Sequence, residues 1–563
     1  MGEIMIIDNV FLKHLWGSKE PPYSKEWNKR IKLWISELLN HLYTELGEME
    51  FEGFTTMEQL SYEQAVNREF YPMPKGTKWG AKWEYGWFKN SVVLPPQSEG
   101  NRIVIMPSTG GDGIVFVNGA PAGSIDHAHR DITVTKSGRP GTVYDIVIES
   151  YAGHGPHIEN IGPTPPGRIA VPEPPKTQVS MGRSTYGIWE EEAFQLLIDV
   201  TTLYKILISI DEKSLRAQEI SKALRDFTLM VDFEQGYDDR VNSFIEARKR
   251  LKPVLECVNG STVPLMHIFG QSHIDLAWMW PKAETERKAA RTLSTQTALI
   301  DEYPDYIFFM PQPPLYIMLK NRYPDLYQRV LERVMEGRIM PEGAMWIEAD
   351  TNMPSGESLI RQFIYGKRFF NEEFGIDSVL LWLPDTFGFS AALPQIAAGC
   401  GVKYFATQKI LRSYYDADPF PYNIFMWEGI DGTQILTHIF KKNNSHIDPE
   451  ILIQRWESDR NQQEDISVFM FPFGYGDGGG GPTRYHIEYA ARMKDLEGVP
   501  RAKMCHPNKF FSEIEKKRPP LKRYVGELYF QAHRGTYTTQ AKTKRGNRKS
   551  EFALRECAFW LTA

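Results

Sequence analysis

The sequence predicts a multidomain fold in which an N-terminal helical segment and a β-sandwich precede an α/β domain and the start of a further helical domain. Three observations support this prediction. At 563 residues the chain is too long for one ordinary domain. From about residue 70 the helical spacing of apolar residues gives way to short alternating runs. From residue 263 apolar runs of strand length alternate with longer amphipathic stretches.

The first three segments differ in the spacing of their apolar residues. Residues 1–65 are predicted to be helical, because apolar residues recur at helical spacing through RIKLWISELLNHLYTEL. Residues 66–204 contain short alternating runs such as WGAKWEYGWFKNSVVLPP and TVYDIVIESYAGHG, which predict an antiparallel β-sandwich. Residues 205–255, with LRAQEISKALRDF, are predicted to form a helical connector.

Residues 256–535 alternate strand-like and helix-like stretches. VPLMHIFG precedes AETERKAARTLSTQTALIDEY, SVLLWLP precedes AALPQIAAGCG, and ISVFMFPFG precedes TRYHIEYAARMKDL. This order predicts parallel β/α architecture, in which ligands bind outside the carboxyl ends of the strands. Residues 536–563 are predicted to begin another helical domain.

The composition excludes several classes of protein. The net charge is −6, and no basic run exceeds the Lys/Arg cluster near 542–549, which argues against a nucleic-acid partner. No apolar stretch approaches the roughly 20 residues of a membrane helix, and the N-terminal apolar run is too short for a signal peptide. The four cysteines lie far apart without a C-x-x-C pair, so neither a disulfide framework nor a thiolate zinc site is indicated. A cytoplasmic protein is expected.

The first candidate for chemistry is the H-x-D pair of His273 and Asp275 in GQSHIDLAWMW, which follows a predicted strand. Side chains two residues apart in an extended segment leave the same face, so these two could bind one metal ion. The same pattern occurs at His129/Asp131, within the predicted sandwich, and at His446/Asp448, where Asp448 precedes Pro449. That second aspartate is better interpreted as a helix N-cap with proline at N1. Position at a strand end therefore favours His273 and Asp275.

Three further segments place polar residues after predicted strands. Asp385 follows SVLLWLP, although a helix cap is an alternative for it. Asp477 lies in PFGYGDGGGGPT, which lacks the G-K-[ST] of a phosphate-binding loop. It is a candidate general acid, or else part of a plain surface turn. His533 follows the strand-like YVGELYF, where a structural histidine is the alternative.

Together these residues offer two imidazoles and two carboxylates, from His273, Asp275, Asp385 and His533. Such a mixed donor set suits Zn²⁺, and Mn²⁺ and Co²⁺ are also compatible with it. Should Asp477 not act as the acid, Glu348 and Asp350 in MWIEADTN are the next candidates.

Three motifs in register carry a family resemblance. GQSHIDLAWMW, WLPDTFGFSAALPQI and ELYFQAHRGTYTTQAKTKRGNR occur in this order and resemble glycoside hydrolase family 38, the class II α-mannosidases, and most closely their cytosolic and bacterial branch. The resemblance covers about 255–563, and WGAKWEYGWFKNSVVLP resembles the N-terminal domain of that branch. It implies that the catalytic domain is a distorted β/α barrel that hydrolyses terminal α-D-mannosides of oligosaccharides.

The resemblance also implies roles for individual residues. His273, Asp275, Asp385 and His533 would bind one zinc ion, and Asp385 would double as the nucleophile of a retaining mechanism. The PFGYGDGGGG loop lies where the family places its acid/base, which makes Asp477 the expected equivalent. Trp278 falls where the family uses an aromatic ring against the sugar.

Two other functions stay open at this stage. A zinc-dependent sugar deacetylase would use similar ligands but would attack with metal-activated water. A carbohydrate-binding fragment without activity is the other alternative, because family members run further than this chain and a truncated chain is expected from its end at ECAFWLTA. The expected partner is a mannoside or oligosaccharide, and the sequence leaves a homo-oligomer open.

Overall fold

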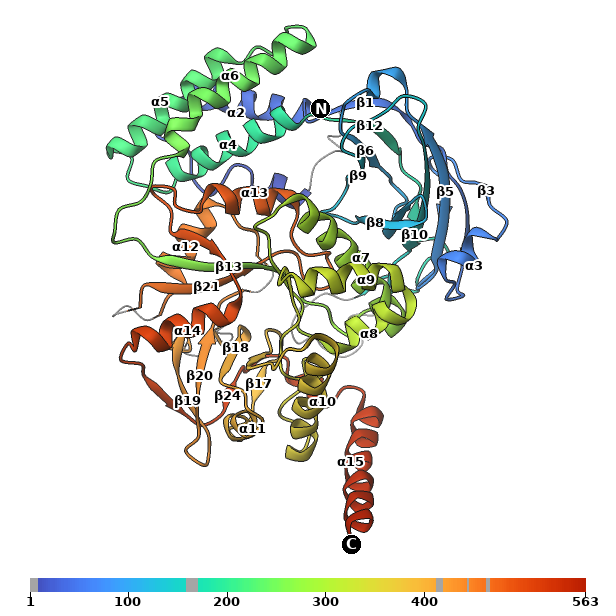
Figure 1. The fold of residues 1–563 in the computed structure, drawn as a ribbon, viewed down its shortest axis with the longest axis vertical. Helices are drawn as coiled ribbons and strands as arrows, with labels where there is room; N and C mark the ends of the chain where they lie inside the picture. Colours follow the sequence, from blue (N-terminus) through green and yellow to red (C-terminus); the bar gives the residue numbers. More distant parts are fainter. Residues whose placement is uncertain (1–8, 158–170, 412–418, 443–444, 462–465) are drawn as a thin grey trace.

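The computed structural model describes residues 9–157, 171–411, 419–442, 445–461 and 466–563 (Figure 1). It begins with two helices, α1 (Asn9–His14) and α2 (Lys25–Asn40). The side chain of Ser24 accepts a hydrogen bond from the backbone N–H of Trp27 and so caps α2 at its N-terminus.

The prediction of a wholly helical segment over 1–65 is wrong beyond Asn40. Strands β1 (Tyr43–Glu48) and β2 (Glu52–Thr56) follow α2, and only the short helix α3 (Tyr62–Val66) comes after them. The run LYTEL keeps an apolar spacing that fits a helix, but a run this short does not distinguish the two periods. Its pairing partner, β12 (Thr185–Trp189), lies about 140 positions away, so local sequence does not show it.

The predicted β-sandwich is present as two antiparallel sheets. The first has the strand order β1-β12-β6-β9 and the second β3-β2-β5-β10-β7-β8. Apolar side chains of both sheets share one buried core. The remaining strands are β3 (Tyr71–Pro72), β5 (Tyr85–Val93), β6 (Ile103–Met106), β7 (Asp112–Val117), β8 (Ala120–Ile125), β9 (Ile132–Thr135) and β10 (Val143–Tyr151), beside a small pair, β4 (Lys78–Trp79) and β11 (Val179–Ser180).

The helical connector begins earlier than expected and includes α2. Helix α4 (Glu191–Leu207) starts directly after the sandwich, and α5 (Leu215–Met230) and α6 (Tyr237–Leu255) follow it. These three helices pack with α2 at one end of the molecule (Figure 1). Helix α4 is buried along most of its length because it also contacts α12 (Pro449–Ser458) and α13 (Arg484–Arg492) of the α/β domain.

The α/β domain contains two sheets built mostly of parallel strands. One joins β15 (Ile339–Met340), β14 (Phe308–Phe309), β13 (Leu265–Gln271) and β21 (Val468–Phe473) in that order, with β22 (Arg501–Met504) also on β13. The other has the order β16 (Leu380–Trp382), β18 (Tyr404–Thr407), β20 (Gln434–Ile439), β19 (Ile424–Glu428) and β23 (Arg523–Val525). Only the β19–β20 pairing is antiparallel within these two sheets.

The two sheets share a core, in which the rings of Phe309 and Trp382 lie 4.9 Å apart between centroids. The described residues form no continuous ladder between the sheets, so closure into a distorted barrel stays a prediction. Helices pack around the sheets, as the strand–helix alternation predicted. They are α7 (Lys282–Glu302), α8 (Pro313–Arg322), α9 (Pro324–Met335), α10 (Gly356–Phe374), α11 (Leu393–Gly399), α12, α13 and α14 (Pro507–Lys517).

The C-terminal part of the chain folds back on the α/β domain before it leaves it. Strand β24 (Leu528–Tyr529) pairs with β17 (Gly388–Phe389), just beyond Asp385. Helix α15 (Ala541–Thr562) then extends away from the body of the molecule and buries none of its side chains (Figure 1). Among the described residues no helix has the length and apolar character needed to cross a membrane.

Candidate active site

His273 and Asp275 lie in the loop that leaves the carboxyl end of β13, and Asp385 lies in the loop after β16. A ligand atom of each residue lies within 4.8 Å of one of each of the other two. The β13 loop is held in place because the Gln312 side chain donates a 2.8 Å hydrogen bond to the carbonyl of Ile274. The structure therefore brings together three of the four residues that the sequence suggested as metal ligands.

Glu348 orients both halves of this group. Its Oε1 lies 2.8 Å from Nδ1 of His273, and its Oε2 accepts a 3.2 Å hydrogen bond from the backbone N–H of Asp385. Burial raises the pKa of Glu348, although His273 partly offsets that effect. Sequence reasoning named Glu348 only as a substitute acid, because the H-x-D pattern carries no signal for a third residue 75 positions away.

The Nε2 atom of His273 is buried, has no hydrogen-bond partner and lies 3.4 Å from Oδ1 of Asp275. Burial would lower the pKa of His273, but the carboxylates of Glu348 and Asp275 outweigh it and raise the pKa well above 6.5. An unused imidazole nitrogen among carboxylates, with a glutamate on the other ring nitrogen, is the usual arrangement around a histidine that binds a metal. The donor set therefore fits a divalent metal such as zinc.

Asp385 also has a cationic neighbour that the sequence did not point to. Lys409 lies in η2 (Lys409–Leu411), just beyond the carboxyl end of β18, and its ammonium nitrogen is 2.8 Å from Oδ1 of Asp385. The signal that could have found it is its position, because Lys409 is the second residue after KYFAT, a strand whose carboxyl end lies at the same edge of the domain as Asp385.

A cavity of about 150 Å³ opens at this group and is lined by His273, Asp275, Glu348, Asp350 and Asp385, with Phe387 and Tyr537 among its walls. Four of these side chains are carboxylates, which makes the cavity suited to a cation. The open space would admit a small part of a ligand, such as one sugar ring, and not a whole oligosaccharide.

His533 lies at the rim of this cavity and is exposed. Its ring centroid is 5.1 Å from that of Phe387, which lines the cavity, but His533 does not belong to the group of three donors. The β17–β24 pairing brings its segment to this place. Its role as a fourth ligand stays a prediction.

Asp477 lies in the glycine-rich loop after β21, next to the His273 segment. The backbone N–H of Gly478 donates a 3.1 Å hydrogen bond to the carbonyl of His273. Gly478 has a φ of +80°, and a Cβ there would come within 3 Å of the Lys288 side chain, so this position requires glycine. Asp477 itself is exposed and is not among the residues that line the 150 Å³ cavity.

Trp278 lies in the same loop as His273 but points to the surface. Its side chain is 57% exposed, and its ring lies edge-on to that of Trp280, 5.5 Å away between centroids. It does not line the 150 Å³ cavity, so contact with a bound sugar stays a prediction.

Comparison with known families defines the class of this protein. Residues 264–532 match the N-terminal domain of the family 38 glycosyl hydrolases, and residues 48–169 match an α-mannosidase jelly roll domain. The two matched regions are thus those of a glycoside hydrolase family. The chain belongs to glycoside hydrolase family 38, the class II α-mannosidase family, as the three sequence motifs indicated.

Individual relatives agree with this assignment. α-Mannosidase G of Dictyostelium discoideum is 35% identical over 507 residues, which are 88% of this chain and 45% of the relative. α-Mannosidase 2C1 of Homo sapiens is 32% identical over 90% of this chain and 48% of its own length. The chain thus spans about half the length of these relatives. A solved α-mannosidase from Enterococcus faecalis V583 overlaps 47% of this chain and 31% of its own at 20% identity with a TM-score of 0.42, too low to support further argument.

Proposed function

We propose that this chain carries the catalytic region of a retaining, zinc-dependent α-mannosidase that removes terminal α-D-mannosides from oligosaccharides. The observation that carries the proposal is the convergence of His273, Asp275 and Asp385 on one small cavity in a chain of family 38. A cytoplasmic location and the oligomeric state stay predictions.

His273, Asp275 and Asp385 would hold the metal, with His533 as the proposed fourth ligand. When bound, zinc supplies a positive charge that can bind two adjacent hydroxyls of the sugar and favour a flattened ring. Mn²⁺ or Co²⁺ could fill the same mixed nitrogen and oxygen donor set. Glu348 keeps Nδ1 of His273 engaged, so that Nε2 stays directed at the site.

Asp385 is the proposed nucleophile, and Asp477 is the proposed acid/base. Asp385 attacks the anomeric carbon and forms a glycosyl ester, while the leaving oxygen takes a proton from Asp477. Water then hydrolyses the ester as Asp477 takes up a proton, and the original configuration is restored. The Lys409 ammonium places a positive charge beside the proposed nucleophile, 2.8 Å from Oδ1 of Asp385. Asp477 is exposed, so a bound oligosaccharide would have to cover it for the proton transfer to be shielded from water.

Metal content and turnover of an aryl α-mannoside test the proposal together. We expect the protein to bind zinc and to hydrolyse the mannoside. Chelation should abolish this hydrolysis, and added Zn²⁺, Mn²⁺ or Co²⁺ should restore it. Zinc without mannoside hydrolysis, but with release of acetate from an acetylated sugar, would favour a deacetylase. Binding of mannosides without any turnover would favour a carbohydrate-binding fragment. Full activity in protein shown to be free of metal would refute the metal requirement.

The stereochemistry tests the role of Asp385. Two displacements retain the anomeric configuration, so proton NMR should detect α-mannose as the first product, before mutarotation. If β-mannose appears first, water attacks directly and Asp385 serves only the metal.

His533→Ala tests the fourth ligand. We expect this variant to lose bound zinc, although His533 lies 260 positions from His273 in the chain. Phe387→Ala is the matched variant, because it removes the ring that contacts His533 at the cavity wall without removing a ligand. Stoichiometric zinc in His533→Ala would exclude His533 from the ligand set.

A further inference from the structure

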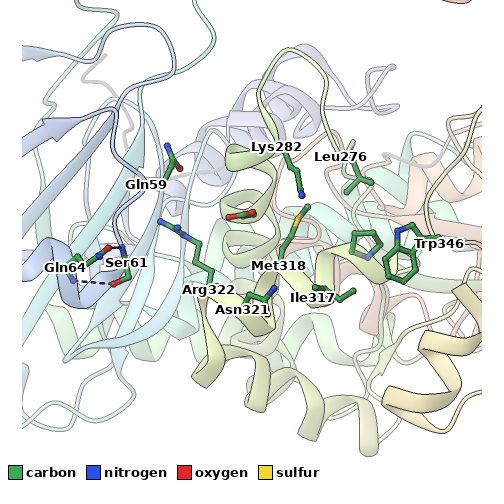
Figure 2. A pocket seen from close by; sticks show the side chains of 12 residues that line it. Gln59, Ser61, Gln64, Leu276, Lys282, Ile317, Met318, Asn321, Arg322 and Trp346 are labelled. Carbon is green, nitrogen blue, oxygen red and sulfur yellow. Dashed lines mark hydrogen bonds between the residues drawn. The ribbon is translucent and has the colours of Figure 1, made fainter. Parts of the chain in front are cut away.

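A second, larger cavity lies between the sandwich and the α/β domain. Its volume is about 600 Å³, which is within the usual range for ligand-binding pockets. Figure 2 shows its lining side chains, which extend from Ser61 and Gln64 on the sandwich side to Trp346 on the α/β side. Helices α7 and α8 form the wall between these two ends.

This cavity shares two loops with the candidate active site. Leu276, which lines it, directly follows Asp275, and Trp346 precedes Glu348 by two residues. The carbonyl of Leu276 accepts a 2.7 Å hydrogen bond from the Thr285 hydroxyl, which fastens the first loop to α7. A ligand in the larger cavity would therefore contact the same loops that position the proposed metal ligands.

The lining offers uncommitted polar groups beside apolar surfaces. In the part of the chain that the structure describes, the side chains of Lys282, Glu286 and Asn321 make no hydrogen bond or ion pair. Trp346 and Met318 add an aromatic ring and an apolar chain. The lining thus combines a cationic donor, an anionic acceptor and an amide with an aromatic surface. This combination suits a neutral ligand with many hydroxyls, since a sugar presents C–H faces as well as O–H groups.

The sandwich side of the cavity is held firmly against the α/β domain. Arg322 donates a hydrogen bond to the carbonyl of Leu60, and Arg287 donates a 2.5 Å hydrogen bond to Oε1 of Gln59. Arg287 is buried and also pairs with Glu149 of β10 at 2.6 Å. A cavity with such walls is formed before a ligand arrives, so binding costs little ordering of the protein.

We propose that this interdomain cavity is a second oligosaccharide subsite, which holds a branch of the substrate away from the bond that is cleaved. The proposal rests on the proposed function. It assigns the sandwich a part in substrate binding, because Gln59, Ser61 and Gln64 come from that domain.

The kinetic test compares two substrates in each variant. 4-Nitrophenyl α-mannoside fills only the small cavity, whereas α-linked mannopentaose can reach the larger one. Asn321→Ala and Trp346→Ala should each lower the ratio of kcat/KM for mannopentaose to that for the aryl mannoside by about tenfold, the effect of losing one important contact. Trp83→Ala, which removes an exposed sandwich tryptophan outside this cavity, should leave the ratio as in the wild type.

A binding measurement separates failure of the subsite from failure of the proposed function. Saturation-transfer NMR with mannopentaose should show contact with the wild-type protein and a weakened signal in Asn321→Ala, whether or not the sugar is hydrolysed. If the aryl mannoside is not hydrolysed but this NMR result is still obtained, the proposed α-mannosidase activity is overturned and the subsite stands. The subsite would be overturned if the NMR signal and the kinetic ratio were the same in Asn321→Ala, Trp346→Ala and Trp83→Ala. It would also be overturned if the wild-type protein showed no NMR contact with mannopentaose.

Discussion

Two H-x-D pairs of the α/β domain have nearly the same local geometry but different surroundings. In the first, Nε2 of His273 lies 3.4 Å from Oδ1 of Asp275. In the second, Nε2 of His446 lies 3.4 Å from Oδ2 of Asp448. Both Nε2 atoms are buried without a hydrogen-bond partner. The pattern alone therefore does not distinguish a metal site from a structural cluster.

The surroundings of His446 supply a histidine and a cation as direct partners. Its Nδ1 lies 3.0 Å from Nε2 of His486, and the Lys205 ammonium lies 2.9 Å from Oδ2 of Asp448. Burial would raise the pKa of Asp448, but Lys205 outweighs that effect and holds the pKa below its ordinary value. Asp448 also accepts a hydrogen bond from the backbone of Ile451 and caps α12, as the sequence predicted.

The surroundings of His273 are the reverse. Glu348 occupies Nδ1, and Asp385 adds a further carboxylate from another strand end, so negative charge accumulates around an unused nitrogen. The third pair resembles the second, because His129 is paired with Asp126 at 2.9 Å and Asp131 with Arg484 at 3.2 Å. What distinguishes the candidate metal site is thus an excess of carboxylates, because the four that line the cavity outnumber the Lys409 ammonium beside Asp385.

The strongest test of this contrast substitutes the two histidines in parallel. His273→Ala should lose its zinc and about 10⁴-fold in kcat, because a metal contributes several kcal/mol and about 1.4 kcal/mol is tenfold in rate. His446→Ala should keep zinc and activity but unfold more easily, since it leaves Nε2 of His486 buried without the partner that His446 provides. Metal analysis, aryl mannoside kinetics and thermal denaturation check both variants. Loss of zinc from His446→Ala with the fold intact would contradict the contrast.

The acid/base assignment predicts an effect that depends on the leaving group. Asp477→Ala should slow an alkyl or sugar mannoside by about 10²–10⁴-fold, whereas a dinitrophenyl mannoside, which needs no proton, should keep its first step. Added azide should then speed turnover and yield a mannosyl azide, which product analysis would detect. An equal loss for both substrates without azide rescue would point to Asp350, which lines the 150 Å³ cavity, as the next candidate.

A smaller effect is expected from the residue that orients His273. Glu348→Gln should weaken zinc binding by about 10–100-fold, the usual cost of losing the partner of a metal-bound histidine, and excess zinc should restore activity. Titration against a competing chelator measures the affinity. The matched control is Glu342→Gln, since Glu342 is a buried carboxylate of the same loop that pairs with His506 instead. Unchanged zinc affinity in Glu348→Gln would show that the carboxylate does not act through His273.

The smallest effect concerns how the free energy of unfolding depends on pH through the neighbouring histidines His14, His446 and His486. Burial, with His446 nearby, lowers the pKa of His14 to about 4, and burial holds that of His486 well below 6.5. The unfolded chain therefore takes up these protons first as pH falls, so the free energy of unfolding should be highest above pH 6.5 and decline from 6.5 toward 4. Denaturation midpoints across this range measure the decline. His14→Gln should flatten it, and His127→Gln, at an exposed histidine, should not.

The sequence alone determined the order and type of most elements and the residues at strand ends. Alternating runs fixed the antiparallel sandwich, and strand–helix alternation fixed the parallel sheets, because both patterns report which side chains face a core. The three motifs around His273, Asp385 and His533 were sufficient for the family. Each of these inferences depends on neighbours within about twenty residues.

Only the tertiary structure decided which of those residues meet. It moved 43–56 from the predicted helix into the sandwich, brought Glu348 and Lys409 to the site, and left His533 beside Phe387 and outside the group of three donors. It also separated the three H-x-D pairs, which are alike in sequence. The physical reason is that pairing partners, counter-charges and burial come from segments far apart in the chain, and local spacing carries no record of them.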